Sequence, residues 1–88
     1  MKLCGEFVVR TVLDDVVAIP VGETALRFNG MIMLNAVSHI IWQCLQIDVT
    51  LDDVVQAVTE NFEVSEEEAS ADIVEFLDKL RKVQLLEE

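Results

Sequence analysis

The chain has 88 residues, a hydrophobic fraction of 52% and a formal net charge of −11, with six Lys and Arg against seventeen Asp and Glu. Phosphate binding relies on clustered positive charge, so this balance argues against nucleic acids and anionic membrane surfaces as partners. The length predicts one domain over residues 1–88. The high apolar content indicates either an efficient core or some apolar surface left exposed for a partner.

The ends and the cysteines indicate the expected compartment. Lys2 and Glu6 bring charge almost at once, which is not the pattern of a signal peptide. No apolar run approaches the length of a membrane-spanning helix. Cys4 and Cys44 are far apart and lack the spacing of a metal site. We therefore expect a cytoplasmic protein with two free thiols, with a disulfide between them as the alternative.

The first half of the sequence predicts a β-hairpin. Phe7–Leu13 and Val16–Val21 are rich in β-branched and aromatic residues, which favour strands. Between them lies Asp14-Asp15, a polar pair suited to a tight turn. Pro20 cannot donate a ladder hydrogen bond, so we expect it at the end of the second strand or at a sheet edge.

A less regular segment, residues 22–30, precedes a third strand. Glycines bracket this segment, and Leu26 and Phe28 alternate with Arg27, so part of it could be extended and cover the edge of the core. Met31–Leu34 then places four apolar residues in a row, which is typical of a short strand that is buried or paired.

The second half predicts three helices. The first covers Ala36–Leu45, with Asn35 as its N-cap, and the second begins after Thr50. The third follows Ser65-Glu66-Glu67-Glu68, which has the form of a capping box, and continues to about Lys82. Three short strands followed by three helices predict an α+β fold of the winged helix-turn-helix type.

The sequence contains no pattern typical of an active site or a metal site. His39 is the single histidine and has no acid or Cys at ligand spacing on its helix face. Cys44 lies on the apolar face of the first helix, where we expect a small buried side chain. There is no Gly-rich phosphate loop and no Ser/His/Asp set. We therefore expect a protein that is not an enzyme and needs no metal or cofactor.

The strand Met31–Leu34 is the best candidate for a binding element, with ordinary core as the alternative. Edge strands usually carry a Lys or Pro that blocks pairing, and this strand has neither. Gly30 beside it would let a second backbone approach closely. Methionine suits surfaces that accept varied apolar partners. The strand is therefore predicted to accept a peptide as an added strand. Pairing with a second copy of the chain, as a homodimer, is a further alternative.

A series of short motifs runs along almost the whole chain, from Phe7 to Leu86. In order they are Phe7-Val8-Val9-Arg10, Pro20-Val21-Gly22, Phe28-Asn29-Gly30-Met31-Ile32, Leu34-Asn35, Ile41-Trp42, Thr50, and Ala71-Asp72 with Phe76-Leu77 and Leu80. Together these motifs resemble the PqqD family, named for coenzyme pyrroloquinoline quinone (PQQ) synthesis protein D. Two positions depart from the family pattern. Ala36 stands where an acid is usual, and Val83-Gln84-Leu85 stands where Lys-Gly-Leu is usual, which is expected to remove a left-handed helix cap.

The resemblance implies a peptide-recognition domain. Such a domain captures the leader segment of a ribosomally made precursor peptide and presents it to a modifying enzyme, often a radical S-adenosylmethionine (SAM) protein. In the family, the leader adds as a strand beside the third strand, in the groove between that strand and the third helix. Carried over, the implied binding residues are Met31, Ile32, Met33, Leu34, Asp72, Phe76, Lys79 and Leu80. Members serve many peptide classes, so PQQ biosynthesis is one of several possible pathways.

Overall fold

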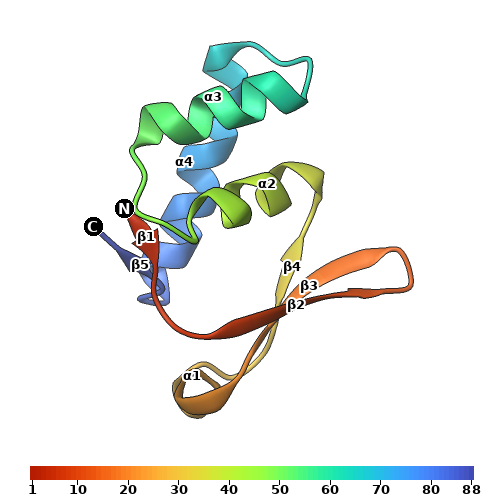
Figure 1. The fold of residues 1–88 in the computed structure, drawn as a ribbon, viewed down its shortest axis with the longest axis vertical. Helices are drawn as coiled ribbons and strands as arrows, with labels where there is room; N and C mark the ends of the chain where they lie inside the picture. Colours follow the sequence, from red (N-terminus) through yellow and green to blue (C-terminus); the bar gives the residue numbers. More distant parts are fainter.

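The computed structural model describes residues 1–88 and contains a three-stranded antiparallel sheet, a group of helices, and a two-stranded sheet that joins the chain ends (Figure 1). The elements in chain order are β1 (Lys2–Leu3), β2 (Phe7–Val12), β3 (Asp15–Pro20), α1 (Gly22–Arg27), β4 (Ile32–Leu34), α2 (Ala36–Cys44), α3 (Leu51–Asn61), α4 (Glu66–Lys82) and β5 (Leu86–Glu87). The predicted α+β class is confirmed. The three expected strands are β2, β3 and β4, and the three expected helices are α2, α3 and α4. No helix is both long and apolar enough to cross a membrane.

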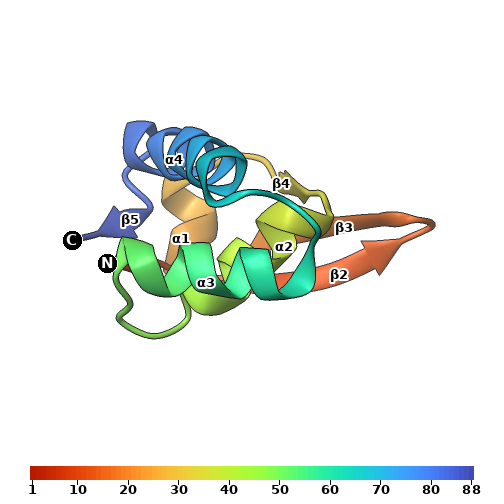
Figure 2. The ribbon, with the colours of Figure 1, turned by 90° about the horizontal axis from the view of Figure 1, so that it is seen from above.

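The hairpin of β2 and β3 turns one residue earlier than the sequence predicted. Val12 pairs with Asp15, so the turn residues are Leu13 and Asp14 rather than the two aspartates. This register keeps Ala18 fully buried, and a slip of one residue would turn it toward the other face of the sheet. Burial along β3 therefore decides the turn more than turn composition does. The hairpin extends away from the helices in both views of the molecule (Figures 1 and 2).

Residues 22–27 form the helix α1, where the sequence left extended structure open. Thr24 is buried, and its hydroxyl accepts a hydrogen bond of 2.8 Å from the Glu6 N–H, which fixes α1 to the segment before β2. The alternation of Leu26 and Phe28 does not reflect a strand. Leu26 lies in α1 and is exposed, whereas Phe28 follows the helix and packs against the core. As a helix, α1 adds no strand to the sheet, whose order is β2-β3-β4.

The N-caps of the three expected helices are those that the sequence predicted. Before α2, Asn35 Oδ1 accepts from the Ser38 N–H and Ser38 Oγ accepts from the Asn35 N–H, both at 2.8 Å. Thr50 caps α3 with the same reciprocal arrangement. Before α4, only half of the expected capping box forms: Ser65 Oγ accepts from the Glu68 N–H at 3.1 Å, and the Glu68 carboxylate makes no return bond. These caps fix where each helix begins.

One hydrophobic cluster joins the sheet to the helices. Its buried members are Ala18, Leu34, Ile41, Trp42, Leu45, Val54, Val58, Ala69, Ile73, Leu77, Leu80 and Leu85. Trp42 of α2 meets Phe7 of β2 edge to face, with ring centroids 5.1 Å apart, and this geometry is favourable for aromatic rings. The core thus forces β4 and α4 onto the same side of α2, which positions the groove described below.

The helix α4 ends in a left-handed residue although the usual glycine is absent. Gln84 has a φ of 59°, and the N–H groups of Gln84 and Leu85 bond to the carbonyl oxygens of Arg81 and Leu80. These two bonds make a Schellman motif. The expectation that Gln84 removes the left-handed cap is therefore wrong, because Gln84 adopts that conformation itself.

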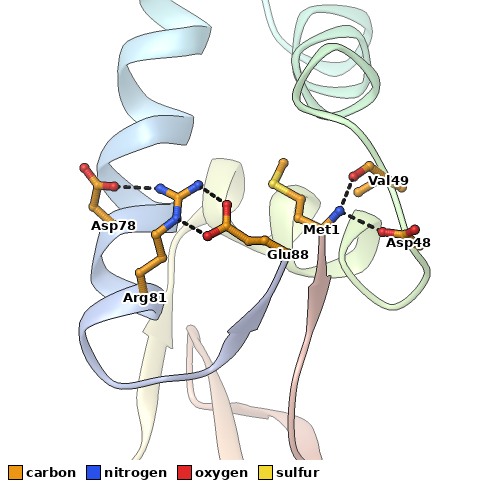
Figure 3. A network of polar contacts seen from close by, with 6 residues as sticks. All are labelled: Met1, Asp48, Val49, Asp78, Arg81 and Glu88. Atoms are coloured by element: carbon orange, nitrogen blue, oxygen red, sulfur yellow. Dashed lines mark hydrogen bonds and ion pairs between the residues drawn. The ribbon is translucent and has the colours of Figure 1, made fainter.

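The chain ends lie side by side next to α4, in β1 and β5 (Figure 3). Two-residue strands leave too little pattern for sequence reasoning to detect. Arg81 bonds to Asp78 at 2.7 Å and to Glu88 at 2.9 Å, and the hydrogen bond from Arg81 lowers the pKa of Glu88. On the other side, the Met1 ammonium donates to Asp48 at 2.7 Å and lowers the pKa of that carboxyl.

Candidate functional site

The strand β4 has one free edge. It pairs with Val16–Ala18 of β3 and has no partner strand on its other side. In an antiparallel ladder, alternate residues direct their N–H and C=O groups away from the partner strand. Neither Lys nor Pro occurs in β4, so nothing in its sequence blocks further pairing. The backbone of β4 can therefore accept one more strand.

The space beside the start of β4 is open. Gly30 has a φ of 130°, a conformation that L side chains rarely adopt, so a glycine is needed there. A Cβ atom built on Gly30 would meet no other atom within 4 Å. Met31 and Met33 are 58% and 57% exposed, which is high for apolar side chains next to a core. The surface at the start of β4 is thus open to a ligand.

A groove of about 470 Å³ follows this edge, where β4, the start of α2 and α4 face one another. The segment up to and including β4 contributes Phe28, Met31, Ile32 and Met33. The start of α2 contributes Asn35, Val37, Ser38 and Ile41. The helix α4 contributes Asp72, Glu75, Phe76, Lys79, Leu80 and Val83. Nine of the 14 lining residues are apolar, so the groove offers mainly hydrophobic surface to a ligand.

One face of the helix α4 packs in the core, and the neighbouring face lines the groove. Ile73 and Leu77 are almost fully buried in the core. Asp72, Phe76 and Val83 follow one another at spacings of four and seven residues, which places them on one helix face. The packing of Ile73 and Leu77 in the core therefore fixes the direction in which the groove face of α4 points.

The charged side chains of the groove all come from α4. Lys79 Nζ lies 3.7 Å from Glu75 Oε1, and both side chains are about 70% exposed, so this ion pair is weak. Asp72 makes no ion pair or hydrogen bond within the chain. Asn35 and Ser38 bond to each other as the cap of α2. The groove therefore has an apolar floor and a charged rim on one side.

The Cys44 thiol is not activated. Both thiols are free and half-buried. Burial raises the pKa of the Cys44 thiol, and the charge of Asp53 raises it further, which keeps Cys44 protonated and poorly nucleophilic. No group of three His, Cys, Asp or Glu residues lies close enough to hold a metal ion. What this site offers chemically is shape, apolar surface and backbone hydrogen-bonding groups.

Most of the residues predicted from the sequence lie together at this groove. Those that line it are Met31, Ile32, Met33, Asp72, Phe76, Lys79 and Leu80. Leu34 does not line the groove, and its side chain is buried in the core at 5% exposure. Its backbone still belongs to β4.

Sequence reasoning missed several lining residues, among them Phe28, Glu75 and Val83. Glu75 and Val83 continue the helical spacing that Asp72 and Leu80 already showed, so that pattern could have found them. Phe28 follows directly after α1, and its position depends on a helix that the sequence did not predict. The edge of β4 and its distance from α4 depend on tertiary packing.

Comparison with known proteins agrees with this geometry. A family profile described as Coenzyme PQQ synthesis protein D (PqqD) matches residues 10–86. The chain is also similar to a solved structure described as TbiB1 in complex with the TbiA(beta) leader peptide, with a TM-score of 0.73 and 25% sequence identity over 99% of this chain and 95% of that chain. Among curated proteins, no sequence matches significantly. Because the profile spans most of the 88 residues, the chain belongs to the PqqD family.

Proposed function

We propose that this protein binds the leader segment of a ribosomally made precursor peptide as an added strand on β4. The observation that carries the proposal is the free edge of β4 beside an apolar groove whose opposite wall is α4. In strand addition, main-chain hydrogen bonds supply affinity, and pockets for alternate side chains supply selection. The groove combines both features in one place.

The short length of β4 limits how the leader is held. A strand of three residues offers an edge of roughly 10 Å. Successive side chains of the added strand point to opposite faces, so apolar residues at alternate positions enter the groove against Phe76 and Ile32. We therefore expect a short recognition core in the leader, with two apolar residues separated by one other residue.

The comparisons support this proposal. The chain belongs to the PqqD family, and a similar protein, TbiB1, is solved with a leader peptide. In our proposal the protein catalyses no step itself and delivers the precursor to a modifying enzyme, of the radical SAM type that the family resemblance implies. It acts in the cytoplasm, where ribosomally made precursors first become accessible. The precursor serves PQQ synthesis or another peptide product.

A second use of the same edge is pairing with another copy of the chain. The exposure of Met31 and Met33 beside an unpaired strand favours this candidate. Two copies with a net charge of −11 each would repel one another, which opposes it. Sedimentation at several protein concentrations, with and without peptide, separates the two. A tight dimer that ignores peptides supports the dimer.

The experiment that tests leader binding is an NMR titration of the protein with candidate leader peptides. Amide shifts should cluster at residues 30–34 and on the groove face of α4. Shifts confined to other parts of the chain contradict the proposed site. Peptides N-methylated at single positions test the binding mode, because each methyl group removes one main-chain donor. Strand addition requires that methylation weakens binding at every second position and has little effect at the positions between.

A further inference from the structure

The charges along the groove are unbalanced. Asp72, Glu75 and Lys79 are its only charged lining residues, two acids and one base. Lys79 already lies 3.7 Å from Glu75, so each of these two partly neutralises the other. Asp72 has no partner of opposite charge and no hydrogen bond within the chain. One uncompensated carboxylate therefore stands at the rim of a mainly apolar groove.

No other cation of the chain is directed to this groove. Arg81, near the C-terminus of α4, is held by Asp78 and Glu88 on the side of the chain ends (Figure 3). Lys82 and the remaining basic residues do not line the groove. Glu66–Glu68 add further acids at the N-terminal end of α4. An acidic ligand would meet only Lys79, which is already paired, whereas a basic ligand meets a free carboxylate.

The position of Asp72 puts it within reach of a peptide in the groove. Asp72 precedes Phe76 by four residues, so the two side chains are neighbours on the helix surface, with Cβ atoms about 5–6 Å apart. A leader residue that packs against Phe76 has its neighbours along the strand about 3.3 Å away per residue. A Lys or Arg two positions away points to the same face of the added strand, so its long side chain can reach Asp72.

Resting on the function proposed above, we infer that the leader recognised by this protein carries a Lys or Arg two residues before or after the apolar residue that packs against Phe76. Asp72 accepts this side chain and disfavours leaders with an acid at the same place. The groove thereby selects leaders by charge as well as by apolar pattern. The preference is local to Asp72, because salt screens the more distant acids over about 8 Å at physiological ionic strength.

The expected difference in affinity follows from the usual strength of solvent-exposed ion pairs. Such a pair changes affinity by a factor of about 1.5 to 5. Replacing the basic residue of the ligand by an acid removes the attraction and adds repulsion of similar size. We therefore expect a ratio of roughly 2 to 25 between the two peptides at low salt, and a smaller ratio as salt rises.

A set of synthetic peptides tests this inference. The probes are extended 12-residue peptides with apolar residues at alternate positions, in which one of these alternate positions carries either Lys or Glu, scanned along the peptide. Dissociation constants are measured for each Lys/Glu pair with the full chain, with Asp72→Asn and with Asp72→Lys. Asp52→Asn on α3 is the matched control, since it removes the same charge from an exposed aspartate outside the groove.

The inference requires that, at one position, the Lys peptide binds the unchanged protein more tightly than the Glu peptide does. Asp72→Asn should remove this difference and Asp72→Lys should reverse it. Asp52→Asn should preserve it. Peptides that shift the β4 amides but show no Lys/Glu difference, or one that survives Asp72→Asn, overturn the charge selection and leave the proposed function intact. If no peptide shifts the β4 amides, leader binding itself fails, and the inference fails with it.

Discussion

The Leu85 N–H donates a 2.9 Å hydrogen bond to the carbonyl oxygen of Leu80, and this bond closes the C-terminus of α4. Both leucines are buried, and Leu80 also lines the groove. The bond requires Gln84 to adopt a φ of 59°. The end of α4 is thus held by a strained residue between two well-packed ones, and the burial of Leu85 offsets the strain at Gln84.

Replacing Gln84 by glycine should stabilise the protein. A left-handed conformation costs an L-residue about 1–2 kcal/mol, while glycine adopts it freely but loses more entropy on folding. We expect Gln84→Gly to raise the free energy of unfolding by about 0.5–1 kcal/mol, measured by urea denaturation. Gln56→Gly, inside α3, is the control and should lower it by about 1 kcal/mol. Equal effects of the two variants would contradict the strain at Gln84.

The hairpin turn contains a second strained residue. Leu13 has a φ of 58°, at a turn position normally taken by glycine, and is 92% exposed, so its side chain contributes almost nothing to the core. Leu13→Gly should therefore stabilise the protein by about 0.5–1 kcal/mol in thermal unfolding. The control is Leu26→Gly, which removes a similarly exposed leucine from the helix α1 and should destabilise. A loss of stability with Leu13→Gly would show that Leu13 has contacts that matter.

The sequence was most informative where local rules and packing agree. Asn35, Thr50 and Ser65 start helices in the structure as predicted, because capping depends on residues within one turn. The groove face of α4 was implied by the family resemblance, and its lining residues then lie at the expected spacing.

Prediction failed where distant contacts override local preference. The turn lies at Leu13 and Asp14, one residue before the predicted position, because the burial of Ala18 sets the strand register. The helix α1 depends on the bond between Thr24 and Glu6, eighteen residues apart, and Phe28 takes its place from α1. The β1–β5 pair joins opposite ends of the chain. None of these contacts leaves a periodic signal in the sequence.

The cap of α2 connects β4 to the helix that follows it. Asn35→Ala removes the two hydrogen bonds that Asn35 Oδ1 accepts from the Ser38 N–H and from Ser38 Oγ, while Ser38 Oγ keeps its bonds to the backbone N–H and carbonyl of residue 35. We expect a loss of about 1 kcal/mol in the free energy of unfolding, measured in urea. Asn35→Asp should retain most of the stability, because a carboxylate also caps a helix and interacts favourably with its dipole. If both variants lose the same amount, the cap is not the cause.

The Arg81–Glu88 pair predicts a pH effect. Hydrogen bonding from Arg81 lowers the pKa of Glu88, so the folded state binds this proton less tightly than the unfolded chain does. The pair therefore stabilises the fold above the ordinary pKa of a glutamate, and this contribution disappears as the pH falls through the lowered pKa. NMR titration of the Glu88 carboxyl should show a midpoint below the ordinary value. Arg81→Gln should return the midpoint toward it, and Lys82→Gln should not.

Two phenylalanines, one in the groove wall and one outside it, allow peptide binding to be separated from stability. Phe76 lines the groove and Phe62 does not, while both are half-buried and pack against the core. Phe76→Ala and Phe62→Ala should thus cost comparable stability. Burial of one phenylalanine against a ligand contributes about 1.5–3 kcal/mol, so Phe76→Ala should weaken leader binding by roughly ten- to hundredfold. Phe62→Ala should leave the affinity of the folded protein unchanged. Calorimetric titration, with circular dichroism as the check on folding, measures both, and equal affinities of the two variants would place the peptide outside the groove.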